Sequence, residues 1–184
     1  MSFLGIDPSL SGSGLLIIED DYTLLSKDKF STPVKGVERL YHLELKLQEY
    51  LDVHSNIEFV CIEGPALRET GRIFDLGQWA GILYLTLYKI SIPFIIVAPL
   101  QLKKYVSLIG KNKGKNVVML DIYKYFNIEI RDDDLADAYV LARIAHDYHK
   151  MFVQKQILNL KKARMEVLNK LYETNTKIKK EILL

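Results

Sequence analysis

The sequence has little of what marks small secreted or low-complexity proteins. It contains one cysteine, Cys61, together with ten glycines and five prolines in 184 residues. A single cysteine cannot form an internal disulfide or a cysteine-based zinc site, which is typical of a protein in a reducing compartment. The low glycine and proline content excludes collagen-like and low-complexity structure. With 49% hydrophobic and 26% charged residues, the composition is that of a globular domain.

Long hydrophobic runs are absent as well. The two longest stretches without a charged residue, Leu76–Tyr88 and Ile90–Leu102, have 13 residues each, whereas a membrane-spanning helix needs about 20. The N-terminal residues Met1–Leu10 have no basic segment followed by a long apolar one, so we do not expect them to act as a secretory signal. We therefore expect no association with a membrane.

Neither sign of charge dominates the chain, but the charges are unevenly placed. The net charge is +2, and it divides into −3 over residues 1–150 and +5 over residues 151–184. A basic C-terminal segment suits a polyanionic partner, and it equally suits a solvated helix. Charge alone therefore does not decide between these two interpretations.

The hydrophobic pattern predicts an α/β fold. Short apolar runs bounded by turn residues predict strands, and apolar positions three and four residues apart predict helices. The order predicts a mixed five-stranded sheet flanked by helices, with three antiparallel strands followed by two parallel ones. We divide the chain into a core domain at residues 1–149 and a basic helical extension at 150–184, with one long helix over 151–184. Strands are expected within residues 3–8, 15–19, 22–31, 57–63 and 94–97, and helices within 36–51, 74–89, 100–107, 116–126 and 134–149.

Four acidic residues stand in apolar surroundings. Asp7 ends the first expected strand and Glu63 the fourth, while Asp134 and Asp137 begin a helix on one face of it. Burying an unpaired carboxylate is very costly, so these groups must share a partner or become protonated. Hard cations such as Mg²⁺ take oxygen ligands. Two cations held about 4 Å apart by such acids suit hydrolysis of a phosphodiester.

Each acid also has a purely structural interpretation. Asp7 could cap a turn, Glu63 could end a strand at the surface, and Asp134 could interact with a helix N-terminus. We assign only that last role to Asp132 and Asp133. The placement of the four acids on strand, strand and helix nevertheless favours a metal site.

Five short motifs follow one another over residues 3–146. They are Gly5-Ile-Asp-Pro-Ser-Leu10 with Gly12 and Gly14, Ile62-Glu-Gly64, Leu76-Gly-Gln78 with Gly81, Ala98-Pro99 with Lys103 and Val106, and Asp134-Leu-Ala-Asp-Ala138. Each motif alone is weak, but the five together resemble, in order and spacing, those of RuvC-type Holliday junction resolvases. The resemblance implies an RNase H-like fold, a homodimer with two active sites, and paired cleavage of four-way DNA junctions.

The resemblance also implies the roles of individual residues. Asp7, Glu63, Asp134 and Asp137 match the family's ligands for Mg²⁺ or Mn²⁺, with two ions per active site. The family places a catalytic lysine in the basic loop. Gly114 falls at the matching position, and of its neighbours Lys113 and Lys115 we favour Lys115.

Basic residues near these motifs are candidates for binding DNA. Many family members carry an aromatic residue just after the glutamate motif, where this chain has Arg68 and Arg72 instead. The lysines cluster around a glycine-punctuated loop that can follow a phosphate backbone and gain affinity by counterion release. A solvated surface loop is the structural alternative. The candidates are Arg68, Arg72, Lys103, Lys104, Lys111, Lys113 and Lys115.

Two further hypotheses use the same residues. A nuclease of the same fold could act on flaps, forks or RNA–DNA hybrids. An actin-like nucleotide-binding domain also opens with an aspartate and a glycine-rich hairpin, but it needs a second such half, and no second hairpin of that kind follows. Branched DNA and a second copy of the chain are the expected partners, in the cytoplasm of a bacterium or a phage-infected cell.

Overall fold

The computed structural model describes residues 1–64, 73–108 and 115–182 and contains a single mixed sheet. Its strand order is β3-β2-β1-β4-β5; β1 pairs antiparallel with β2 and β2 with β3, whereas β1–β4 and β4–β5 pair in parallel. This confirms the expected α/β class and sheet. The elements are β1 (Ser2–Asp7), β2 (Ser13–Glu19), β3 (Leu24–Phe30), α1 (Gly36–Val53), β4 (Ile57–Glu63), α2 (Ile73–Lys89), β5 (Phe94–Val97), α3 (Pro99–Ser107), α4 (Lys115–Phe126), α5 (Asp133–Tyr148), the π-helical turn η1 (His149–Val153) and α6 (Lys162–Ile182).

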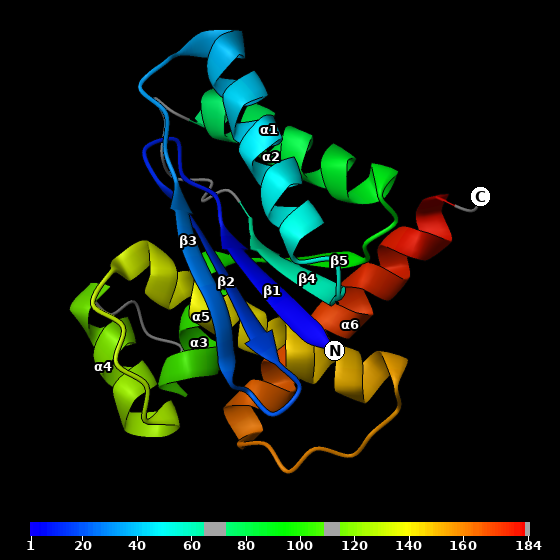
Figure 1. Cartoon of the computed structure of the whole chain (residues 1–184). Helices are drawn as coiled ribbons and strands as arrows, with labels where there is room; N and C mark the ends of the chain where they lie inside the picture. The colour runs from blue at the N-terminus through cyan, green and yellow to red at the C-terminus, as the bar shows by residue number, and fades with distance from the viewer. Residues whose placement is uncertain (65–72, 109–114, 183–184) are drawn as a thin grey trace.

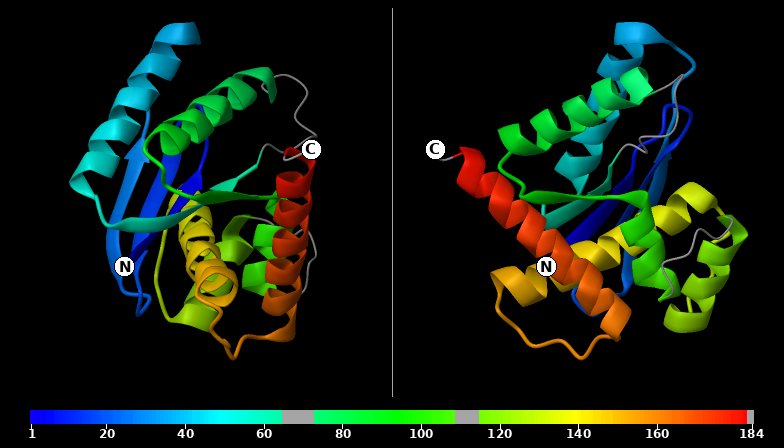
Figure 2. Two further views of the ribbon diagram at one scale, coloured as in Figure 1. Left: turned by 90° about the vertical axis from the view of Figure 1, so that its right-hand side faces the viewer. Right: turned by 180° about the vertical axis from the view of Figure 1, so that it is seen from behind.

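The sheet lies between two layers of helices, α1 and α2 on one face and α3 to α6 on the other (Figures 1 and 2). Side chains alternate between the faces of a strand, so β1 serves both layers. Phe3 packs in the cluster beneath α5, whereas Leu4 and Ile6 pack in the cluster beneath α1 and α2. The central strand is therefore buried on both sides, which explains its continuous apolar sequence.

Two glycines let α5 lie directly on the sheet. A Cβ atom at Gly5 would stand 1.9 Å from the backbone oxygen of Ala138, and one at Gly14 would stand 2.4 Å from that of Asp134. Neither distance is possible for a real side chain, so only glycine allows this approach of helix and strand. The glycines of the first motif thus bring the N-terminal half of α5 to the end of β1.

The C-terminal segment differs from the single long helix predicted over residues 151–184. The π-helical turn η1 ends at Val153, residues 154–161 are not helical, and α6 begins only at Lys162. The chain turns at Lys155, whose φ of 57° is left-handed. Ile157, which the predicted helix would have included, lies in this non-helical segment and is fully exposed.

The reversal of the chain lets α6 pack on the core of the sheet domain. Val167, Leu168 and Leu171 belong to the same buried cluster as α5. Arg164 interrupts the apolar pattern in sequence, but it is buried and its Nε donates to the carbonyl oxygen of Tyr105 at 3.2 Å. The boundary of the extension at residue 150 stays a prediction.

Within the described parts of the chain, none of the helices combines the length and the apolar character that crossing a bilayer requires.

Candidate active site

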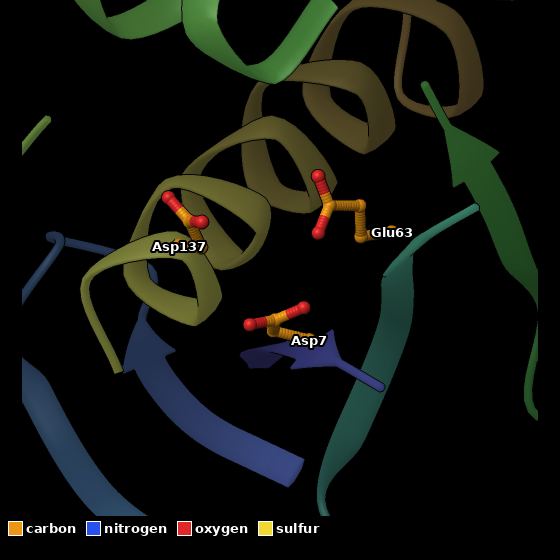
Figure 3. A group of neighbouring side chains, drawn as sticks. All are labelled: Asp7, Glu63 and Asp137. Carbon is orange, nitrogen blue, oxygen red and sulfur yellow. The ribbon is translucent and has the colours of Figure 1, made fainter. Parts of the chain in front are cut away.

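Strand register places two of the predicted acids side by side. Ile6 of β1 pairs with Ile62 of the parallel strand β4, so Asp7 and Glu63 follow at the same edge of the sheet. The third acid, Asp137, comes from the first turns of α5. Carboxylate oxygens of these three residues all lie within 4.8 Å of one another (Figure 3). We call Asp7, Glu63 and Asp137 the carboxylate triad.

The triad lies in an open pocket of about 330 Å³ between the ends of β1 and β4, α2, α3 and α5. Asp133 and Asp134 line the same pocket, and Lys103 of α3 is the basic residue of its wall. Asp7 is only 9% exposed. The pocket therefore gathers five acids around a space that is large enough for cations and a phosphate group.

Burial and mutual repulsion disfavour the charged form of the triad. Burial raises the pKa of Asp7 well above its ordinary value, and the neighbouring Glu63 and Asp134 raise it further. Burial also raises the pKa of Glu63 to about 7 and that of Asp137 to about 7, with the charge of Lys103 opposing both shifts. Strongly raised carboxyl pKa values in a pocket are typical of functional sites.

Asp134 lies beside the triad with its own cationic partner. Its Oδ2 is 2.6 Å from Nζ of Lys29, a residue of β3, and the same ammonium is 2.8 Å from Oδ2 of Asp132. Asp132 is the N-cap of α5 and accepts a hydrogen bond from the backbone of Leu135, as predicted for a structural acid. Asp133, to which we had assigned only a structural role, lines the pocket.

The predicted basic residues fall into three groups. Lys103 reaches the pocket, whereas Nζ of Lys104 pairs with Glu166 of α6 at 2.7 Å. Lys115 begins α4, and the placement of its side chain is outside what the structure describes. Arg68, Arg72, Lys111 and Lys113 lie outside the described residues.

The turn beside the triad is fixed by a tryptophan. Nε1 of the fully buried Trp79 donates to Oγ of Ser13 at 2.9 Å. That hydroxyl in turn donates to the carbonyl oxygen of Ser9 at 2.8 Å and accepts from its backbone N–H at 3.1 Å. Helix α2 thereby holds the β1–β2 turn next to Asp7, a contact that the sequence did not indicate.

A mixed sheet of this order, with a carboxylate cluster at the ends of its central parallel strands, is the arrangement of the RNase H-like class of folds. The comparison with family models narrows the class. The model described as crossover junction endodeoxyribonuclease RuvC matches residues 3–146, so the chain belongs to the RuvC family. It is an endonuclease that resolves Holliday junctions, and the family match decides against the actin-like hypothesis. Nucleases of this family are metal-dependent, in keeping with the acidic cluster.

Solved structures carry the same fold. Thermus thermophilus RuvC is 21% identical with a TM-score of 0.67, covering 84% of this chain and 97% of that one. The T. thermophilus RuvC in complex with a Holliday junction substrate is 22% identical with a TM-score of 0.66, covering 77% and 90%. The yeast mitochondrial Holliday junction resolvase is 16% identical with a TM-score of 0.53, covering 96% and 82%.

Proposed function

We propose that Asp7, Glu63 and Asp137 hold a divalent cation, Mg²⁺ or Mn²⁺, and that Asp134 contributes to a second cation in the same pocket. The observation that carries this proposal is the approach of three carboxylate oxygens to within 4.8 Å, from three different elements. Hard divalent cations prefer such an all-oxygen ligand set. The acids repel one another without a cation, so a cation stabilises their charged forms.

The protein's own part in the reaction is to present these groups in fixed positions. Two such cations, when bound, activate a water molecule and stabilise the leaving 3′ oxygen of a phosphodiester. Asp7 and Glu63 are held by paired strands and Asp137 by a helix packed on Gly5, so the ligand oxygens need little rearrangement. Lys103 offers a positive charge in the pocket wall that attracts the scissile phosphate.

We assign the contacts to the DNA backbone to the basic residues around the pocket. Lys103 lies in the wall of the pocket that holds the acids. To contact DNA, Lys104 would have to break its exposed ion pair with Glu166, which costs little free energy. The catalytic role of Lys115 stays a prediction, as does the cytoplasmic location. So do the DNA contacts of Arg68, Arg72, Lys111 and Lys113.

We also propose that α2 forms the interface of a homodimer, which paired cleavage of a four-way junction requires. Along one face of α2, Phe74, Leu85 and Tyr88 are exposed by 76%, 47% and 77%. Gly77 and Gly81 are exposed on the same helix, and a Cβ added to either would meet nothing within 4 Å. Small residues flanked by large apolar ones allow two helices to approach closely, so a second copy of the chain is the partner we assign to this face.

Strand-specific nick mapping tests the function and the dimer together. With Mg²⁺ and a synthetic mobile four-way junction, the wild-type protein should nick two opposing strands symmetrically and act more slowly on a fork, a flap or an RNA–DNA hybrid. Gly81→Leu should leave a folded monomer, seen by light scattering, that makes unpaired nicks. Equal rates on all four substrates would contradict selectivity for junctions. Paired nicking by a monomeric Gly81→Leu protein would contradict the α2 interface.

A further inference from the structure

Sheet register puts a lysine in line with the active site. Asp7 of β1 pairs with Gly14 of β2, and Gly14 pairs with Lys29 of β3. Residues paired across neighbouring strands point to the same face of a sheet, so Lys29 lies on the face that α5 covers, two strands from Asp7. Gly14 has no side chain between them, and the backbone of Asp134 occupies that space.

The side chain of Lys29 is positioned both along its aliphatic stem and at its ammonium group. Its stem crosses the β1–β2 turn, because a Cβ atom at Gly12 would stand 2.7 Å from its Cε. Its ammonium lies 2.6 Å from Oδ2 of Asp134 and 2.8 Å from Oδ2 of Asp132. Both distances are those of close ion pairs. The ammonium is thus a cation in contact with an acid of the pocket.

Its two acidic partners differ in what fixes them. Oδ1 of Asp132 accepts the backbone N–H of Leu135 at 3.1 Å, which anchors this side chain at the start of α5. Asp134 lines the pocket of the triad and is the more buried of the two side chains, with 24% exposure against 37%. A cation that enters the pocket therefore competes with Lys29 for Asp134, whereas Asp132 remains available to the lysine.

We propose that Lys29 is a positioning residue that holds Asp134 while the pocket lacks its second cation and is retained by Asp132 once that cation binds Asp134. This inference rests on the proposed function, since it concerns a ligand of the same metal site. Like charges on one carboxylate repel each other, so Lys29 weakens cation binding while it keeps Asp134 in place. Removal of the lysine should therefore tighten metal binding and slow the chemical step.

Binding of Mn²⁺ in the absence of DNA tests the inference without reference to nuclease activity. The free Mn²⁺ signal in electron paramagnetic resonance gives the dissociation constants of the wild-type, Lys29→Met, Lys29→Arg and Lys27→Met proteins. Lys29→Met should bind the weaker Mn²⁺ ion roughly threefold to fivefold more tightly, the scale expected for a partly exposed ion pair. Lys29→Arg should stay near the wild-type value.

Lys27→Met is the matched control. Lys27 lies two residues earlier on the same strand and face, opposite Leu16, and is exposed. The Lys27→Met change removes the same charge from β3 but leaves the ion pair between Lys29 and Asp134 in place. The Mn²⁺ dissociation constants of this variant should therefore equal those of the wild type. Equal constants for Lys29→Met and Lys27→Met, or weaker binding by Lys29→Met, would overturn the inference. If Lys29→Met is not folded by circular dichroism, Lys29→Gln replaces it with the same expectation.

The role of Asp132 is tested by a double-mutant cycle. Asp132→Asn keeps a good N-cap but removes the second partner of Lys29. It should weaken Mn²⁺ binding in the wild-type background and do so less in the Lys29→Met background. Equal effects in the two backgrounds would overturn the retention of Lys29 by Asp132.

Cleavage kinetics give an independent signature. Lys29→Met should reach half of its maximal rate at a lower Mg²⁺ concentration and have a lower rate at saturating Mg²⁺. A merely structural loss would not lower the Mg²⁺ requirement. A wild-type protein that binds no Mn²⁺ would overturn the metal site itself, whereas unchanged constants in Lys29→Met overturn only the role of the lysine.

Discussion

The two ends of helix α5 bury acids in opposite ways. Near its C-terminal end the fully buried Asp147 accepts hydrogen bonds from the hydroxyls of Tyr22, at 2.7 Å, and Tyr105, and lies 2.8 Å from Nδ1 of His146. Near its N-terminal end Asp137 lies close to two further carboxylates, with Lys103 in the wall of the same pocket. A buried acid surrounded by donors stabilises the fold, whereas a group of buried acids stores repulsion that a cation can relieve.

The cationic residues around these acids differ between the two ends of α5 as well. Around Asp147, the guanidinium of Arg143 lies 3.9 Å from the ring centres of Tyr22 and Phe126, and α6 sends Arg164 into the same region. The cations there are packed on aromatic rings in the core. At the other end, Lys103 lines the pocket wall, and the ammonium of Lys29 pairs with Asp134 beside the carboxylate triad. One end of the helix is therefore electrostatically complete within the chain, and the other is the end at which we propose that cations bind.

The largest effect should come from Asp7→Asn. This change keeps the shape of the side chain but removes one of the proposed oxygen ligands. Cleavage of a four-way junction with Mg²⁺ should therefore fall by more than about a hundredfold, since even loss of a group that only supports a metal ligand costs up to that much. Binding of the junction in Ca²⁺ should persist, because negative charge is removed. Without metal the variant should be more stable than the wild type at pH 8. Normal cleavage by Asp7→Asn would contradict the proposal that the acids near the N-terminal end of α5 hold a catalytic cation.

The same substitution at the other end should have the opposite effect on stability. Asp147→Asn replaces an acceptor with an NH₂ group that faces two tyrosine hydroxyls and a histidine, so the free energy of unfolding in urea should fall by about 2 kcal/mol. The Mn²⁺ affinity of the folded protein should stay unchanged, because Asp147 is not among the pocket residues. Asp147→Asn with wild-type stability but weaker Mn²⁺ binding would reverse the roles assigned to the two acids.

The sequence predicted the acids but not the surroundings that separate these two roles. Asp7 and Glu63 could be placed because both end apolar runs that pair in parallel, and parallel strand ends share one edge. The approach of Asp137 depends on Gly5, where only a helix backbone fits. Lys29 could not be identified, because its position depends on the register of β2 with β3 and on the missing side chain of Gly14.

The C-terminal segment shows a second limit of the sequence pattern. The periodicity of residues 151–184 is helical almost throughout, and nothing local marks Lys155 as the residue at which the chain turns. Tertiary packing decides there, since the reversed α6 buries Val167 and Leu168 on the core. A residue such as Arg164, polar in a helical seam, gains its hydrogen-bond partner only from that packing.

The smallest expected effect is a dependence of the protein's stability on pH, which the carboxylate triad should produce in the absence of metal. The pKa values of Glu63 and Asp137 rise from 4.5 and 3.8 to about 7 on folding, mainly through burial. Between about pH 4 and 7 the folded state therefore binds more protons than the unfolded state, so stability without metal should fall as the pH rises. The Tm in a chelator should drop on the order of 5 °C from pH 5 to 8, which corresponds to roughly 2 kcal/mol in a chain of this length.

Added Mg²⁺ should remove this dependence, because a cation binds the deprotonated acids and stabilises the folded state most where they are ionised. The effect of Mg²⁺ on Tm should therefore be large at pH 8 and small at pH 5.

The two variants should change the dependence of Tm on pH in chelator in different ways. Asp7→Asn should flatten it, since one of the repelling charges is gone, while Asp147→Asn should lower Tm at every pH without changing the slope. A wild-type Tm that rises from pH 5 to 8 in chelator would mean that the triad is not strained by its own charge. The two ends of α5 would then bury their acids in the same way.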